Sequence, residues 1–266
     1  MIRVASYNMR KAIGTDRRRV PERTLAVINE IGADVIALQE ADRRFGAREA
    51  ALPPYLIAEQ SDYKPVPFDA RDGSLGWHGN ALLVKKDVDV LEKHLFHLPS
   101  LEPRGAVLAE LLVRGQRLRV VGMHLDLSGL WRRRQAHAIL SHLAEQDEAV
   151  PHVLMGDLNE WSAHGGCLRD FAQHHHLVPV GCSFHARRPI ATLDRIMVTP
   201  DLAVLDCGTH LSPLARRASD HLPVWADIAP GEAAPSRIGP PQPTWPARVR
   251  ASLRRPQWLP MRERWR

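Results

Sequence analysis

The sequence predicts an α/β protein built on one mixed β-sheet or on two packed sheets, with helices on the outside. About ten short apolar runs have the length of strands, whereas three or four segments repeat apolar residues at helical spacing. Strands and helices do not alternate strictly, and hairpins occur among the crossover connections. This mixture argues against an all-parallel sheet.

The N-terminal elements follow from these patterns in order. Ile2–Tyr7 is the first expected strand, and a helix ending at Ile31 follows, with Pro21 suited to its first turn and Gly32 to its end. Asp34–Leu38 is an unbroken apolar run too short for a helix, so we expect a strand covered on both faces.

The rest of the chain alternates between irregular and regular segments. Residues 41–79 contain several prolines and are expected to form a loop with minor elements, followed by a strand at Asn80–Val84. A hairpin is expected between Val107–Val113 and Arg117–Met123, and a helix over Leu130–Leu143. The remaining expected elements are strands at His152–Met155, Leu193–Val198, Leu202–Cys207 and Pro223–Ile228, and a helix near Leu168–His175.

Length and composition limit the number of domains and the cellular compartments to be expected. The 266 residues, 44% of them hydrophobic, suffice for one large domain or two small ones. The three cysteines form no CxxC and leave one thiol unpaired, which favours a reducing compartment. No charged and apolar leader pattern stands before the first strand, so a signal peptide is not expected, and no apolar run approaches the roughly 20 residues of a membrane span. The expected location is the cytoplasm, with peripheral membrane contact as an addition.

Positive charge is concentrated at the C-terminus. The chain has 36 Lys and Arg against 30 Asp and Glu, and the segment from Gly231 onward holds eight Arg and two Glu, so the preceding residues carry 28 of each sign. Seven prolines also fall after Pro230. We therefore expect a globular domain at residues 1–229 and a flexible Pro/Arg/Trp-rich tail at residues 230–266. The basic composition does not mark the domain itself as a nucleic-acid binder.

Polar residues end or interrupt the apolar runs. A polar side chain at a strand end costs little free energy if it faces a solvated cleft, and much more if it is buried alone. The recurrence of such residues therefore predicts one polar site where several strands converge. The residues are Asn8, Glu40, His124, Asp157 with Asn159, Asp194, and the pair Asp220 and His221.

Each of these residues also has a structural alternative. Asp157 and Asn159 can activate water and hold a phosphoryl oxygen, or can form an ordinary turn after a strand. Asp220 and His221 can serve a metal and a phosphate, or can cap a turn. Asp194 interrupts an apolar run, so it needs a partner, and either a histidine or its neighbour Arg195 can supply one.

Two histidine motifs carry less weight by themselves. His124 lies in an apolar strand, where a satisfied core residue is the commoner role, and Asp126 can lie on the same face. The tract 174–176 consists of three consecutive histidines, which point in different directions on a helix. We expect this tract to be a solvated helix end.

Taken in order, these motifs resemble the endonuclease/exonuclease/phosphatase superfamily, which includes DNase I-like nucleases, neutral sphingomyelinases and inositol-polyphosphate phosphatases. The resemblance covers residues 1–229. It implies a four-layer α/β-β/α sandwich of two packed mixed sheets and a phosphodiester hydrolase that requires Mg²⁺, which Mn²⁺ can replace.

The resemblance also implies roles for the polar residues. Glu40 would be the principal metal ligand, with Asn8 and Asp220 assisting. Asp157 would activate water and Asn159 would hold the phosphate. The remaining implied residues are His221 as phosphate ligand or acid/base, Asp194 as its orienting partner, His124 as a catalytic donor, and Asn80 and Asp126 as substrate-binding residues.

Three functions compete within this framework. The substrate is either nucleic acid, or a phospholipid headgroup or small phosphate ester, and the third hypothesis is a non-catalytic binding module. The resemblance places His124 where abasic-site endonucleases of the superfamily carry Tyr. The exonuclease III-like branch of the superfamily is therefore disfavoured. The tail alternates arginines with Trp245, Trp258 and Trp265, a pattern that suits an anionic membrane surface or single-stranded nucleic acid. We favour the membrane surface, and expect a monomer.

Overall fold

The computed structural model describes residues 1–43, 49–69, 73–102, 104–146 and 149–231. The chain divides into a compact unit, Met1–Glu232, and a second unit, Ala233–Arg266. The predicted tail from residue 232 onward lies outside the described residues. Within the described ranges, no helix is both long and apolar enough to cross a membrane.

The described residues form two mixed six-stranded sheets. The first sheet has the order β11 (Leu202–Thr209), β12 (Val224–Pro230), β1 (Ile2–Asn8), β2 (Val35–Gln39), β4 (Ala81–Lys85) and β3 (Tyr63–Pro65). The second has the order β5 (Asp89–Phe96), β6 (Gly105–Val113), β7 (Gln116–His124), β8 (His152–Asp157), β10 (Asp194–Val198) and β9 (His176–Leu177).

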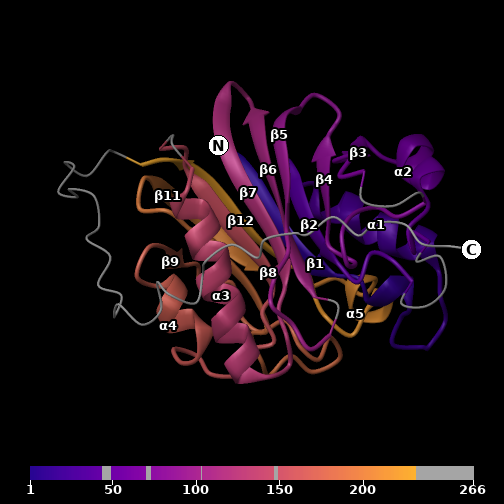
Figure 1. Cartoon of the computed structure of the whole chain (residues 1–266). Coiled ribbons are helices and arrows are strands. Elements are labelled where there is room, and N and C mark those ends of the chain that lie inside the picture. The colour runs from indigo at the N-terminus through magenta and orange to yellow at the C-terminus, as the bar shows by residue number, and fades with distance from the viewer. Residues whose placement is uncertain (44–48, 70–72, 103, 147–148, 232–266) are drawn as a thin grey trace, which may run out of the picture. The chain divides into compact units, whose positions relative to one another are not determined.

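The two sheets pack face to face, with helices on both outer faces (Figure 1). The side chains of α1 (Pro21–Ile31), α2 (Pro54–Gln60) and α5 (Ala215–Ala218) share a core with the first sheet. Those of α3 (Gly129–Ala144) and α4 (Cys167–Phe171) share a core with the second sheet. A third core fills the space between the sheets. The four-layer α/β sandwich predicted from the sequence is therefore confirmed.

The strand β2 shows how sequence pattern determines this layering. Val35 and Ala37 enter the core between the sheets, whereas Ile36 and Leu38 pack beneath the helices. Successive side chains of a strand point to opposite faces, so a strand buried on both faces must be apolar throughout. The unbroken run in the sequence is thus a direct consequence of the four layers.

Each sheet contains one parallel pair of strands joined through a helix. The pair β1 and β2 is connected through α1, and the pair β7 and β8 through α3. Parallel neighbours require such a crossover, whereas the antiparallel neighbours β6 and β7 are joined by the short turn at Arg114 and Gly115. The C-terminal ends of each parallel pair lie side by side, which places the residues that follow them together.

The structure departs from the sequence-based expectations at two points. The strand β5 was not predicted, because most of its side chains are exposed and its sequence lacks a clean apolar alternation. Residues 41–79, expected as a loop with minor elements, contain the short elements α2 and β3 in their described part, in agreement with that expectation. The helix expected near Leu168–His175 ends at Phe171, and His175 is buried, so the histidine tract is not a solvated helix end.

Candidate active site

The predicted polar residues lie at the same end of both sheets. Asn8 ends β1, and Glu40 follows the last residue of β2. His124 and Asp157 end the parallel strands β7 and β8 and are paired in register. Asp194 begins β10 and pairs with Asp157 from the other side. The strand register therefore aligns polar ends within the second sheet, whereas Glu40, Asn159 and the Asp220–His221 pair come from segments that adjoin the strands.

Local backbone features support this convergence. A Cβ atom at Gly156 would lie 1.8 Å from the carbonyl oxygen of Met123, so glycine allows β8 to approach β7 closely just before His124 and Asp157. Glu40 and Asn159 have φ values of 53° and 50°. Asn adopts this left-handed conformation readily, but it is strained for Glu, and such strain is common at functional sites.

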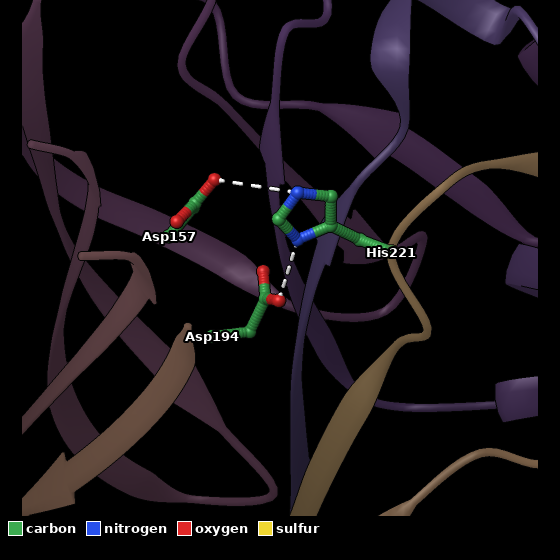
Figure 2. Close-up of side chains that lie close together, drawn as sticks. All are labelled: Asp157, Asp194 and His221. Atoms are coloured by element: carbon green, nitrogen blue, oxygen red, sulfur yellow. Dashed lines mark hydrogen bonds and ion pairs between the residues drawn. The ribbon is translucent and has the colours of Figure 1, made fainter. Parts of the chain in front are cut away.

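The centre of the site is a histidine between two carboxylates (Figure 2). Nδ1 of His221 lies 2.7 Å from Oδ2 of Asp194, and Nε2 lies 3.8 Å from Oδ2 of Asp157. All three side chains are buried. Burial opposes the charged ring, but the carboxylates of Asp194 and Asp157 raise the pKa of His221 to about 10. The two carboxylates therefore favour the imidazolium form of His221 at neutral pH.

Asp157 is held by groups from both sheets. Asn8 donates from Nδ2 to Oδ2 of Asp157 at 2.8 Å, and the backbone N–H of Asn159 donates to Oδ1 at 3.0 Å. Burial raises the pKa of Asp157 to about 6, against the opposing effect of His221. A carboxylate with a pKa close to neutrality is well suited to accept a proton from water.

His124 and Asn80 form the next part of the site. Nε2 of His124 lies 3.4 Å from Oδ2 of Asp157, and the Arg104 guanidinium contacts the same imidazole. Burial, reinforced by Arg104, lowers the pKa of His124 well below its usual value, so the ring is neutral. Asn80 donates to the carbonyl of Gly105 at 3.0 Å, and its buried Oδ1 has no hydrogen-bond partner.

The three residues predicted to hold a metal all contact the segment Arg10–Lys11. The Lys11 ammonium contacts the carboxylate of Glu40, and Nε of Arg10 lies 3.2 Å from Oδ2 of Asp220. The N–H of Arg10 donates to Oδ1 of Asn8 at 3.1 Å. Carboxylate and amide oxygens are the donors that Mg²⁺ prefers, and here each of them meets a positive or N–H group. The donor set therefore fits a hard divalent cation.

A second set of potential ligands also occurs. Among the described residues, the group of His, Cys, Asp or Glu side chains whose ligand atoms lie within 4.8 Å of one another comprises Asp157, Asp194 and His221. Neither Glu40 nor Asp220 belongs to it. Because Asp194 is fully buried and already hydrogen-bonded to His221, this group is better suited to proton transfer than to holding a cation.

One predicted substrate-binding residue lies outside this arrangement. The carboxylate of Asp126 accepts hydrogen bonds from the backbone N–H groups of Leu101 and Ser128, at 3.1 and 3.0 Å. Both oxygens are thereby used to connect two loops, and the side chain is 2% exposed. The structure thus gives Asp126 a structural position between two loops, and its contact with substrate stays a prediction.

The structure adds residues that sequence reasoning missed. Ser183 donates from Oγ to Oδ2 of Asp194 at 2.5 Å, and Ser219 donates to the carbonyl of Asn8 at 2.7 Å. Arg104 and Lys11 reach the site as described above. Ser219 directly precedes the Asp220–His221 pair, which was a usable signal, whereas Ser183 and Arg104 lie in loops without a readable pattern.

Comparison with known proteins agrees with this geometry. The model of the Endonuclease/Exonuclease/phosphatase family matches residues 5–221, which is most of the chain and spans the site from Asn8 to His221. The chain belongs to this family. Membership of the endonuclease/exonuclease/phosphatase family makes it a phosphoester hydrolase. No curated protein matches its sequence.

Solved structures show the same fold at low sequence identity. An endonuclease/exonuclease/phosphatase from Bacteroides vulgatus is 21% identical, with a TM-score of 0.68 over 86% of this chain and 99% of that one. The mannosyl-6-phosphatase of Bacteroides thetaiotaomicron is 19% identical, with a TM-score of 0.66 over 86% and 100%. D. rerio TDP2, complexed with a single-strand DNA product, is 18% identical, with a TM-score of 0.66 over 86% and 98%.

Proposed function

We propose that the protein is a Mg²⁺-dependent phosphodiesterase. The observation that carries the proposal is the position of the His221 imidazolium, which Asp194 holds at 2.7 Å beside the buried carboxylate of Asp157. This arrangement places a proton acceptor and a positive hydrogen-bond donor next to each other in a site largely closed to water.

Each residue of the site has a separate role in the proposed reaction. Asp157, fixed by Asn8 and Asn159, takes the proton of the attacking water. His221 donates from Nε2 to a phosphoryl oxygen, and the neutral His124 supplies a second donor. Donors of this kind contribute about 2–4 kcal/mol each to transition-state stabilisation in other hydrolases. Asn80, with its free Oδ1, is positioned to contact the substrate near His124.

The cation site is assigned to the oxygen donors. Glu40, Asp220 and Asn8 would hold Mg²⁺, with Mn²⁺ as a substitute. When bound, the cation would polarise the phosphoryl group and neutralise its negative oxygens. Lys11 and Arg10 must release these carboxylates at least in part, and both side chains are exposed enough to move, at 24% and 37% of their surface.

The first test uses the full-length protein and a generic chromogenic substrate, bis(p-nitrophenyl) phosphate. EDTA should abolish hydrolysis, and Mg²⁺ or Mn²⁺ should restore it. Asp157→Asn should reduce kcat by roughly 10²–10⁴-fold while the circular dichroism spectrum is unchanged. Full activity in EDTA would exclude the metal-dependent mechanism, and near-normal turnover of Asp157→Asn would exclude Asp157 as the base.

Apolar side chains around the site favour a phospholipid over a nucleic acid as the substrate. Trp161 is 65% exposed and makes an edge contact with Phe184, whose ring lies 4.9 Å from that of His221. Three more apolar side chains are exposed: Leu127 and Ile190 on loops, and Leu130 in the first turn of α3.

The loops that carry Leu127, Trp161 and Ile190 are connected to one another or to the site by hydrogen bonds and an ion pair. Arg132 donates to the carbonyl of Leu127 at 2.6 Å and pairs with Glu160 at 3.1 Å, which joins the loop of Leu127 to that of Trp161. The N–H of Ile190 donates to the carbonyl of Phe184 at 2.8 Å. The apolar surface therefore lies beside the reacting groups, where the apolar part of a lipid substrate would rest.

The second test compares phospholipid vesicles with a single-stranded oligonucleotide. We expect hydrolysis of the vesicle substrate, and Trp161→Ala should raise its KM about tenfold, as expected for lost burial of one large apolar side chain. Tyr55→Ala is the matched control, because Tyr55 is 63% exposed but lies on α2. Cleavage of the oligonucleotide with inert vesicles would assign the protein to the nucleases instead.

A further inference from the structure

Two histidines outside the active site have unpartnered buried nitrogens. His175 is 5% exposed, and neither of its ring nitrogens has a hydrogen-bond partner. Nε2 of His152 is also buried without a partner. The two rings lie with their centroids 6.2 Å apart and their planes at 28°. Buried polar atoms are nearly always hydrogen-bonded, so three such nitrogens in one place call for an explanation.

These histidines lie at the opposite end of β8 from the active site. His152 begins β8 and Asp157 ends it, a separation of about 17 Å at the usual strand rise. Leu154, two residues along, packs beneath α3 and α4, so His152 points to this outer face. His175 immediately precedes β9, which pairs with the end of β10. The two rings therefore belong to segments that only the sheet brings together.

His175 is also reachable from solvent through a surface hollow of about 460 Å³ between α4 and β9. The lining includes the polar side chains of His164, Arg169, Gln173 and His176 beside Leu168 and Leu177. It gives a small ligand access to a ring that is otherwise enclosed, and it leaves room for water beside that ring.

The charge state of the two rings selects the class of ligand. Burial lowers the pKa of His152 and of His175 to about 4, and both rings are therefore neutral at pH 7. The nearby groups act in both directions: Arg119 disfavours protonation of His152, and the rings of His152 and His174 disfavour that of His175. Asp201, Glu110 and the backbone of Phe171 favour the charged forms. Neutral imidazoles attract anions poorly but are among the commonest ligands of transition metals.

We propose that His152 and His175 form a second, non-catalytic binding site for a late first-row divalent metal ion such as Zn²⁺ or Ni²⁺. The two imidazoles supply the protein ligands, and water from the hollow completes the coordination. With two protein ligands the site binds more weakly than a four-ligand structural zinc site. A bound ion links the segment after α4 to the start of β8, so it stabilises the folded chain by mass action.

Isothermal titration of the full-length protein with Zn²⁺ tests the proposal. Millimolar Mg²⁺ is present throughout to occupy hard oxygen sites. The wild type should bind one equivalent of Zn²⁺ that His175→Ala does not bind. His174→Ala, the exposed neighbour, should keep this equivalent, and so should His221→Ala, which disrupts the active-site cluster. The melting temperature should rise with Zn²⁺ in the variants that keep it.

The outcome that would overturn the proposal is equally direct. If His175→Ala and His174→Ala bind the same number of Zn²⁺ equivalents with the same affinity, the pair is not a metal site. If His175→Ala does not fold, His152→Gln at the partly exposed partner ring gives the same test: loss of the equivalent supports the site, and its retention excludes it.

Discussion

At the scale of single residues, the site depends on how Asp194 is held. Its Oδ2 accepts hydrogen bonds from Ser183 and His221 at 2.5 and 2.7 Å, and the side chain is fully buried. A carboxylate fixed in this way keeps the imidazole in one orientation and favours its charged form. Ser183 therefore acts on the reaction indirectly, through Asp194, as a positioning residue.

This arrangement predicts a graded loss of activity. Asp194→Asn should lower kcat by roughly 10²–10⁴-fold, because the charge that stabilises the His221 imidazolium is lost. Ser183→Ala should lower kcat by roughly tenfold, since one of the hydrogen bonds that orient Asp194 is removed. Steady-state kinetics with a generic phosphodiester measure both effects, and KM should change little in either variant.

Two further substitutions distinguish a positioning role of the Ser183 hydroxyl from a general structural role of this residue. Ser183→Thr retains a hydroxyl and should recover part of the lost kcat, whereas Ser162→Ala, at an exposed position on a neighbouring loop, should leave kcat unchanged. Equal losses in Ser183→Ala and Ser183→Thr would contradict a hydrogen-bonding role for this residue.

The sequence identified the residues that end apolar strands, because burial makes a polar side chain there conspicuous. Asn8, His124 and Asp157 were found in this way, and the structure brings them together. Ser183 and Arg104 were not found, since their loops carry no periodic pattern and their partners are remote in sequence. The residues that position a catalytic group are therefore harder to predict than the group itself.

At the scale of elements, the hairpin of β6 and β7 contains a buried charge cluster. Glu110 is 1% exposed and lies opposite Arg119, which is 4% exposed. The Glu110 carboxylate accepts from Nε of Arg117 at 2.8 Å and from Nε of Arg119 at 2.9 Å. Breaking such a buried pair leaves an uncompensated charge, which costs about 3–5 kcal/mol.

The cluster predicts a pH-dependent change in stability for Glu110→Gln. Burial opposes ionisation, but Arg117 and Arg119 hold the pKa of Glu110 below its usual value of 4.5. A carboxyl whose pKa is lowered on folding stabilises the protein above its unfolded pKa, and this contribution is lost as the pH falls below about 4.5. Urea unfolding should therefore show a loss of about 3 kcal/mol at pH 7 and a smaller loss at pH 3.5.

The neighbouring strand provides a matched control. Glu92 on β5 is paired in register with Glu110, but its side chain is 62% exposed. Glu92→Gln should change the free energy of unfolding by less than about 0.5 kcal/mol at either pH. An equal effect of the two substitutions, or a pH-independent loss in Glu110→Gln, would show that the buried charge pair does not stabilise the hairpin.

Element prediction succeeded where burial imposes a pattern and failed where it does not. The helix α3 and the doubly covered strand β2 were located to within a residue or two at their ends. The edge strand β5 is largely exposed, so no apolar periodicity marks it. The burial of His175 could not be predicted, because it arises from tertiary packing, in which the ring of His152, remote in sequence, is a neighbour.

At the scale of the whole molecule, charge is divided unequally between the residues before Gly231 and the segment that begins there. Residues before Gly231 have equal numbers of basic and acidic side chains, and the net charge of +6 belongs to the remaining segment, which also contains three tryptophans. A lipid substrate would give this segment a purpose, because basic residues and tryptophans both favour an anionic membrane surface. The segment lies outside the described residues, so its role stays a prediction from the sequence.

Truncation after Gly231 tests this prediction without touching the active site. Each Arg near an anionic surface contributes about 1 kcal/mol, so the eight tail arginines should dominate binding to vesicles that contain phosphatidylserine. The full-length protein should co-sediment with these vesicles at least tenfold more strongly than the truncated protein. The difference should shrink at high salt and on neutral vesicles, because the attraction is electrostatic.

Since the tail provides no proposed catalytic group, both proteins should hydrolyse a soluble diester at the same rate, so unequal turnover would signal damage to the compact unit. Equal sedimentation of the two proteins on anionic vesicles would remove the tail as a membrane anchor and weaken the case for a lipid substrate.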